Sequence, residues 1–92
     1  MIKSFKDKDT EALSENRYVK AFDGIQVSAR KKLDVLKAAK GLPDLAAVPG
    51  NRLEALHGDR EGQHSVRIND QYRICFVADG EDFRDVEITD YH

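Results

Sequence analysis

The chain is 92 residues long, with 40% hydrophobic and 35% charged residues and a formal net charge of -2. This length predicts a single domain, residues 1–92, with one small hydrophobic core. The charge excludes indiscriminate nucleic-acid binding, which needs an uncompensated basic surface. No apolar run is long enough to cross a bilayer, and the lone Cys75 leaves no internal disulfide, so we expect a cytoplasmic protein with no membrane partner.

The first half of the chain predicts helices. Residues Ile2–Phe5 are compatible with an edge strand, and a short helix is expected over Asp9–Ser14. The clearest helix runs from Ile25 to Lys40, where apolar residues recur at helical spacing. Gly41, followed by a proline two residues later, should end this helix through a left-handed C-terminal conformation.

A connector follows this helix and leads to the second half of the chain. Residues 42–51 hold two prolines and predict a linker with a single helical turn. The lysines of the preceding helix, Lys31, Lys32, Lys37 and Lys40, are most simply a solvated face, although a contact with ribosomal RNA would use the same residues.

The second half changes to the two-residue alternation of β-strands. Strands are predicted at Arg52–Leu56, Gln63–Ile68, Tyr72–Val77 and Phe83–Ile88, with a loop at Gly58–Gly62 and two-residue turns at Asn69–Asp70 and Asp79–Gly80. The helices need an apolar face to cover, and one face of this sheet supplies it. The sequence therefore predicts an α+β fold, with N-terminal helices packed on one face of a small, mainly antiparallel twisted sheet.

Two arginines are expected side by side on the other face of that sheet. Strand alternation turns Arg67 and Arg73 away from the helices, and the hairpin makes them opposite or diagonal neighbours. Like charges at this separation repel, so an anion should compensate them. The anion is either a bound phosphate or an internal carboxylate, from Glu54, Asp85 or Glu87.

The last three residues, Asp90, Tyr91 and His92, combine a carboxylate, a phenol and an imidazole. Histidine titrates near neutral pH, and neighbouring carboxylates favour its protonated form. Such a group can perform acid–base catalysis. The alternative is a last strand whose tyrosine packs on the domain and whose histidine is solvated, and the residues alone leave both interpretations open.

The other chemically active side chains favour structural roles. His64 shares its strand face with apolar residues, which favours a partly buried core histidine over a catalytic one. His57, His64, Cys75 and His92 lack the spacing of metal ligands, so we expect no metal and no cofactor.

Three motifs occur together in the second half of the chain: Gly58-Asp59-Arg60, the run from Asn69 through Phe76, and the ending Asp90-Tyr91-His92. In this combination the chain resembles the HigB toxins of the RelE/ParE superfamily, which belong to bacterial type II toxin–antitoxin modules. The resemblance is strongest over residues 51–92, and the opening Met1–Phe5 and the total length are also similar.

The resemblance implies a toxin that enters the A site of the 70S ribosome and cuts mRNA there. Family cleavage uses no metal and proceeds by attack of a ribose 2′-hydroxyl on its adjacent phosphate. The implied partner is a HigA-like helix-turn-helix antitoxin, and only through it would the toxin meet operator DNA. An alternative is a toxin-fold binding protein without nuclease activity, such as a ParE-like gyrase inhibitor or a degenerate toxin acting through its antitoxin complex.

The resemblance also assigns catalytic residues. Arg73, Asp90, Tyr91 and His92 occupy positions that are tied to activity in HigB toxins. Arg73 would hold the phosphate charge, and His92 would act as acid or base. Tyr91 would donate a proton or stack on a base, with Asp90 orienting one of its neighbours.

Substrate contacts are expected from Arg67, Arg60 and His57. Some HigB toxins have a histidine where this chain has Glu54, and a lysine where it has His57. Glu54 is accordingly a candidate general base, and the alternative is that it pairs with Arg67 or Arg73.

Overall fold

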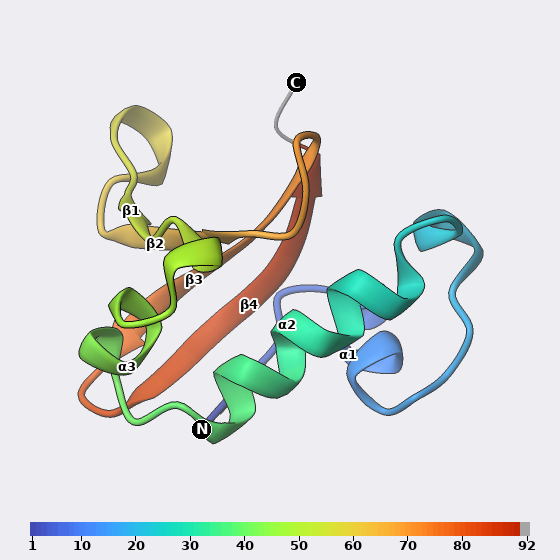
Figure 1. Cartoon of the computed structure of the whole chain (residues 1–92), viewed down its shortest axis with the longest axis horizontal. Helices are drawn as coiled ribbons and strands as arrows, with labels where there is room; N and C mark the ends of the chain where they lie inside the picture. Colours follow the sequence, from blue (N-terminus) through green and yellow to red (C-terminus); the bar gives the residue numbers. More distant parts are fainter. Residues whose placement is uncertain (91–92) are drawn as a thin grey trace.

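Helices pack on one face of an antiparallel sheet in residues 1–90, the part of the chain that the computed structural model describes (Figure 1). The strands lie in chain order across the sheet: β1 (Glu54–Ala55), β2 (Gln63–Arg67), β3 (Tyr72–Asp79) and β4 (Asp82–Asp90). The predicted α+β fold with its antiparallel sheet is confirmed.

The helices are short and come almost entirely before the sheet. They are α1 (Lys8–Ser14), η1 (Lys20–Phe22), α2 (Gln26–Ala38), α3 (Leu42–Ala46), η2 (Pro49–Asn51) and η3 (Gly58–Arg60), of which the η elements are 3₁₀ turns. α2 ends before the predicted Lys40, because Ala39 is extended and buried in the core. Gly41 does have positive φ (94°), but it precedes α3 instead of capping α2.

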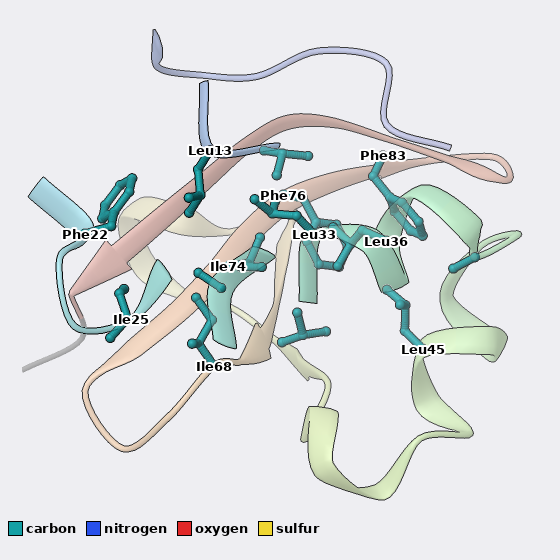
Figure 2. Close-up of a cluster of buried hydrophobic side chains, with 14 of the residues drawn as sticks. Leu13, Phe22, Ile25, Leu33, Leu36, Leu45, Ile68, Ile74, Phe76 and Phe83 are labelled. Atoms are coloured by element: carbon teal, nitrogen blue, oxygen red, sulfur yellow. The ribbon is translucent and has the colours of Figure 1, made fainter. Parts of the chain in front are cut away.

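The core lies between the sheet and the helices (Figure 2). Leu33 and Leu36 of α2 belong to the same buried cluster as Ile74, Phe76 and Phe83 from the sheet, and all five are fully buried. The rings of Phe76 and Phe83 meet edge to face, with centroids 4.9 Å apart. Burying each such side chain contributes about 1.5–3 kcal/mol, so this cluster fixes which face of each strand points inward.

A β-bulge in β4 lets two of its residues enter the core out of strict alternation. The β3–β4 register shifts between Cys75 and Val77, and Asp85 takes a left-handed conformation with φ 53°. The extra residue places Phe83 and Val86 both on the core side, where each is fully buried. A regular strand would have turned one of them to the opposite face.

The predicted strand boundaries were wrong at several places, since β2 already ends at Arg67, β3 continues to Asp79 and β4 spans Asp82–Asp90. The strand expected at Arg52–Leu56 is limited to Glu54–Ala55, because Arg52 has φ 44° and turns the chain directly after η2. The N-terminal segment Ile2–Phe5 is not a continuous strand. It lies parallel to β4 through isolated bridges at Ile2 and Phe5.

Both hairpin turns also differ from the predicted positions. The β2–β3 turn covers residues 68–71, and not Asn69–Asp70 alone, because Arg67 pairs directly with Arg73 and the Asn69 side chain accepts hydrogen bonds inside the turn. The β3–β4 turn is Gly80–Glu81 instead of Asp79–Gly80.

Thr10 ties α1 to the end of β4. This side chain is fully buried, and its hydroxyl donates to the carboxylate of the N-cap residue Asp7 at 2.7 Å. The same hydroxyl oxygen accepts from the amide of Ile88 at 3.1 Å. A first-turn residue of a helix therefore positions the last part of the final strand.

Replacing Thr10 with valine should destabilise the protein. The change keeps the side-chain shape but removes the hydroxyl, which leaves the partly buried Ile88 amide without this partner, at a cost of about 1 kcal/mol. Urea unfolding measures the loss. Thr10→Ser, which retains the hydroxyl, should lose less, and a valine variant as stable as the parent would contradict the assigned link.

Candidate functional site

A pocket of about 260 Å³ lies beside the β2–β3 turn. Its lining residues are Arg52, Glu54, Arg67, Asn69, Asp70 and Arg73. Three arginines against two carboxylates give this lining a positive surplus. The surplus is local, because residues 51–92 as a whole carry five arginines and ten acidic residues.

Arg73 is held rigidly in this pocket. Only 11% of its side chain is exposed. Its Nε donates to Ser65 Oγ at 2.7 Å, and its Nη2 donates to the carbonyls of Arg52 at 2.6 Å and of Ser65 at 3.3 Å. Within residues 1–90 the Nη1 group donates no hydrogen bond, so two N–H donors remain for a ligand.

Arg67 and Arg73 face each other across the β2–β3 hairpin, as the sequence predicted. A different carboxylate lies beside each of them. Arg67 donates to Asp70 at 2.5 Å, and Arg73 lies 4.0 Å from a carboxylate oxygen of Glu54. The two like charges are therefore compensated separately, from the turn on one side and from β1 on the other.

Of the three internal counter-ions considered from sequence, Glu54 is the one that approaches the arginine pair. Glu87 accepts from Arg60 at 2.6 Å, and Asp85 lies 3.4 Å from Arg84. Asp70, which the sequence interpretation placed only in a turn, is the partner of Arg67.

Lys32 of α2 approaches the pocket from the helical side, so it is more than part of a solvated helix face. Its Nζ donates to Oδ1 of Asn51 at 2.5 Å, and the fully buried Asn51 side chain in turn donates to the Leu45 carbonyl. Partial burial, together with the nearby positive charge of Arg67, lowers the pKa of Lys32. The folded chain thus holds two cations near each other.

Asp70 experiences the same positive field. The hydrogen bond and the charge of Arg67 lower the pKa of the Asp70 carboxyl, and the charge of Arg52 contributes in the same direction. These effects favour the charged carboxylate of Asp70, which is the anion beside Arg67.

Two predicted substrate contacts lie outside the pocket lining. Arg60 donates to Glu87 and, at 3.0 Å, to the side chain of Gln63. His57 is exposed and immediately precedes η3. Both residues belong to the segment between β1 and β2, which forms the loop at the upper left of Figure 1.

The predicted C-terminal residues are only partly described. Asp90 pairs with Tyr72 across β3 and β4, and its carboxylate accepts from the Gln71 side chain at 2.9 Å. This pairing puts Asp90 on the same face of the sheet as Tyr72, while Arg73 pairs with Thr89. The predictions for Tyr91 and His92 fall outside the described residues.

Two further reactive side chains, His64 and Cys75, pack within the described part of the chain. His64 stacks on Phe76 with ring centroids 6.3 Å apart, in agreement with the prediction of a partly buried histidine. Burial raises the pKa of the Cys75 thiol. Across residues 1–90, no three His, Cys, Asp or Glu side chains gather in a group that could hold a metal ion, and no helix is long and apolar enough to span a membrane.

Sequence reasoning missed four contributors to the pocket environment. Ser65 could have been found, because strand alternation puts it on the face of Arg67. The Arg52 carbonyl, Asp70 and Lys32 had no such signal, since their placement depends on a left-handed backbone, a longer turn and the buried Asn51.

Comparison with known proteins identifies the class. The family model of the RelE-like toxin of the type II toxin–antitoxin system HigB matches residues 3–92. The chain is 40% identical over 78 residues to Toxin HigB-1 of Vibrio cholerae serotype O1, a match that covers 83% of this chain and 82% of that protein. It is also 37% identical over 46 residues to an uncharacterized protein of Haemophilus influenzae, covering 50% of this chain and 46% of that protein.

The fold and these matches define a RelE-like toxin of a type II toxin–antitoxin module, a class in which an antitoxin is the partner of the toxin. Within that class, the chain belongs to the HigB-like toxin family.

Replacing Arg67 with glutamine should raise the pKa of Lys32 toward the ordinary lysine value of 10.5. The arginine charge contributes to the lowered pKa, whereas the burial that also lowers it would remain. NMR titration of the lysine side-chain signals measures the shift. Arg84→Gln, a change at an exposed arginine of β4, should leave the Lys32 pKa unchanged, and equal titration curves in both variants would show that Arg67 does not act on Lys32.

Proposed function

We propose that this toxin is an endoribonuclease that cuts mRNA in the ribosomal A site and thereby inhibits translation. Membership of the HigB-like family supports this activity, and the arginine-lined pocket supplies a place for a phosphate. The reaction would be metal-independent transesterification. The ribose 2′-oxygen bonds to the adjacent phosphorus, the bond to the 5′-oxygen breaks, and a 2′,3′-cyclic phosphate remains.

The observation that carries the proposal is the fixed and mostly buried Arg73. Negative charge grows on the non-bridging phosphoryl oxygens during the attack, and preorganised donors stabilise that charge without reorganising. Ser65 and the Arg52 carbonyl hold the guanidinium in place and leave its Nη1 donors available within the described chain. Arg67, directly across the hairpin, would contact the substrate as a second cation.

Glu54 is the candidate base nearest to this guanidinium. Its carboxylate lies 4.0 Å from Arg73, which is close enough for attraction and beyond hydrogen-bond distance. Glu54 is also more than half exposed, so a ribose hydroxyl can reach it. Two roles remain: it accepts the proton of the 2′-hydroxyl, or it only balances the charge of Arg73.

The proton for the departing 5′-oxygen would come from the C-terminal segment. His92 is the proposed acid or base, Tyr91 a proton donor or stacking partner of a base, and Asp90 an orienting carboxylate. β4 runs to Asp90 and ends beside the β2–β3 turn, as the Gln71–Asp90 hydrogen bond indicates (Figure 1). That turn also lines the pocket, but the pairing with Tyr72 puts the Asp90 side chain on the face opposite Arg73, so the role proposed for the terminal segment rests on the family resemblance.

The proposed partners follow from the class and from the charge distribution. We propose a HigA-type helix-turn-helix antitoxin as the neutralising partner, with operator DNA reached only through it. The ribosome would hold the mRNA substrate in its A site, where the toxin would meet it. The chain is weakly acidic as a whole and the arginine-lined pocket is only locally cationic, so free RNA should bind weakly and the ribosome would have to position the strand.

Arg73→Ala should lower mRNA cleavage in a translation extract by about 100-fold to 1000-fold, the usual effect of removing one preorganised donor at a developing oxyanion. Primer extension on a defined mRNA measures the cut in the A site. Thermal unfolding of the variant tests whether the fold survives the loss of a buried side chain.

Arg84→Ala is the matched control for this experiment. Arg84 is an exposed arginine of the same sheet, paired with Asp79 and Asp85 away from the pocket lining, so cleavage should be unaffected. If the unmodified toxin leaves the mRNA intact but blocks DNA supercoiling by gyrase, the nuclease proposal fails and the ParE-like alternative is favoured.

Glu54→Gln separates the two roles of this carboxylate. If Glu54 is the general base, cleavage should fall by about 100-fold or more, because the amide cannot accept the hydroxyl proton. Urea unfolding should change little, because the ion pair with Arg73 is long and largely exposed on the glutamate side. Unchanged cleavage by a folded variant would leave Glu54 as a counter-ion only.

A further inference from the structure

Asp70 places a carboxylate in the proposed phosphate pocket from an exposed turn. Its side chain is 96% exposed, yet it accepts a hydrogen bond from Arg67 at 2.5 Å and lines the pocket together with Arg73 and Glu54. A carboxylate bound to a guanidinium uses the same donors that a phosphate would use. Asp70 therefore occupies the Nη2 donor of Arg67 that a phosphate could use.

The turn that carries Asp70 is held by its neighbour. The side-chain oxygen of Asn69 accepts from the amides of Gln71 at 2.9 Å and Tyr72 at 2.8 Å, which closes an Asx turn around Asp70. The backbone is thus ordered while the Asp70 side chain stays in solvent. Such a carboxylate can leave Arg67 by rotating its side chain, without unfolding the turn.

More positive charge surrounds this point than Asp70 can neutralise. Arg52 lines the same pocket and acts electrostatically on Asp70, while Arg67 acts on Lys32. Two cations, Arg67 and Arg52, thus act on this one carboxylate, and a third, Lys32, lies near Arg67. Arg73, on the other side, has its own partner in Glu54.

We propose that Asp70 occupies a second phosphate subsite, built from Arg67 with Arg52 and Lys32 near it, and that an RNA backbone enters by displacing this carboxylate. The inference rests on the proposed function, since it assigns the Arg67 subsite to a phosphate that neighbours the one at Arg73. The substrate is then a single strand that presents successive phosphodiesters. Displacement costs affinity, so Asp70 keeps the binding of free RNA weak and favours a strand that the ribosome delivers at high local concentration.

The test is binding of a short fluorescein-labelled 2′-O-methyl RNA oligonucleotide, followed by fluorescence anisotropy at low salt. The 2′-O-methyl groups block cleavage, so the titration reports binding alone. Asp70→Asn should tighten binding about fivefold, because the amide competes poorly for Arg67 and leaves its donors open. Arg67→Gln should weaken binding and lower the slope against log salt concentration by about 0.7, the value for one lost phosphate contact.

Asp79→Asn is the matched control. Asp79 is also an exposed aspartate paired with an arginine, Arg84 at 3.8 Å, but it lies outside the pocket lining, so this change should leave binding unaltered. An equal gain from Asp79→Asn would mean that net charge, and not displacement at Arg67, governs affinity, and would overturn the inference.

Two further outcomes separate this inference from the proposed function. If Arg67→Gln weakens binding but Asp70→Asn binds like the parent, Asp70 is no competitor and the inference fails while the pocket stands. If Arg67→Gln and Arg73→Ala both bind like the parent, the pocket does not hold RNA phosphates. The proposed function then loses the support of the Arg73 site as well.

Discussion

The direct pairing of Arg67 with Arg73 is the constraint on which the site depends. Two like charges that face each other across a hairpin repel, by tenths of a kcal/mol to about one. The fold accepts this pairing because the register that makes it also pairs Val66 with Ile74 and His64 with Phe76 on the core side. A slip by one residue would remove the arginine repulsion but expose the apolar side chains, at about 1.5–3 kcal/mol each.

The helices enforce this register from the other side of the sheet. Leu33 and Leu36 pack in one cluster with Ile74 and Phe76, so the inner face of β3 cannot turn outward without opening the core (Figure 2). The bulge at Asp85 adds Phe83 and Val86 to the same face. Apolar packing on the inner face therefore sets the strand register, and the register in turn determines which residues share the polar face. The positions of Arg67 and Arg73 thus depend on contacts made by other side chains.

The alternation of β2 and β3 was enough to predict the fold class and the arginine pair from sequence. That pattern determines which side chains share a face, and burial makes one face far better than the other. The bulge at Asp85 was not predictable in this way. An aspartate tolerates a left-handed backbone, but no residue pattern within β4 indicates that a bulge is needed to turn Phe83 into the core.

The same limit explains why half of the pocket was missed. The chain reaches β1 through the left-handed Arg52, which points its carbonyl at Arg73, and this backbone position has no signature in the side chains. Lys32 appears solvated in the helical pattern, yet the buried Asn51 from η2 binds it. Contacts between a loop and a distant element follow from tertiary packing, and periodicity within one segment does not encode them.

Separate compensation of the two arginines has a consequence for how the pocket works. The rigid one, Arg73, is anchored by uncharged groups, the Ser65 hydroxyl and backbone carbonyls, while its carboxylate neighbour Glu54 lies 4.0 Å away, beyond hydrogen-bond distance. The other, Arg67, is bound by a full charge on a solvent-exposed side chain. Neutral anchors preserve the field that a developing oxyanion needs, whereas a solvent-exposed counter-ion can be replaced by a ligand. Under the proposed function, the two halves of the pocket would combine a fixed donor with an exchangeable charge, as binding and then stabilising a phosphate requires.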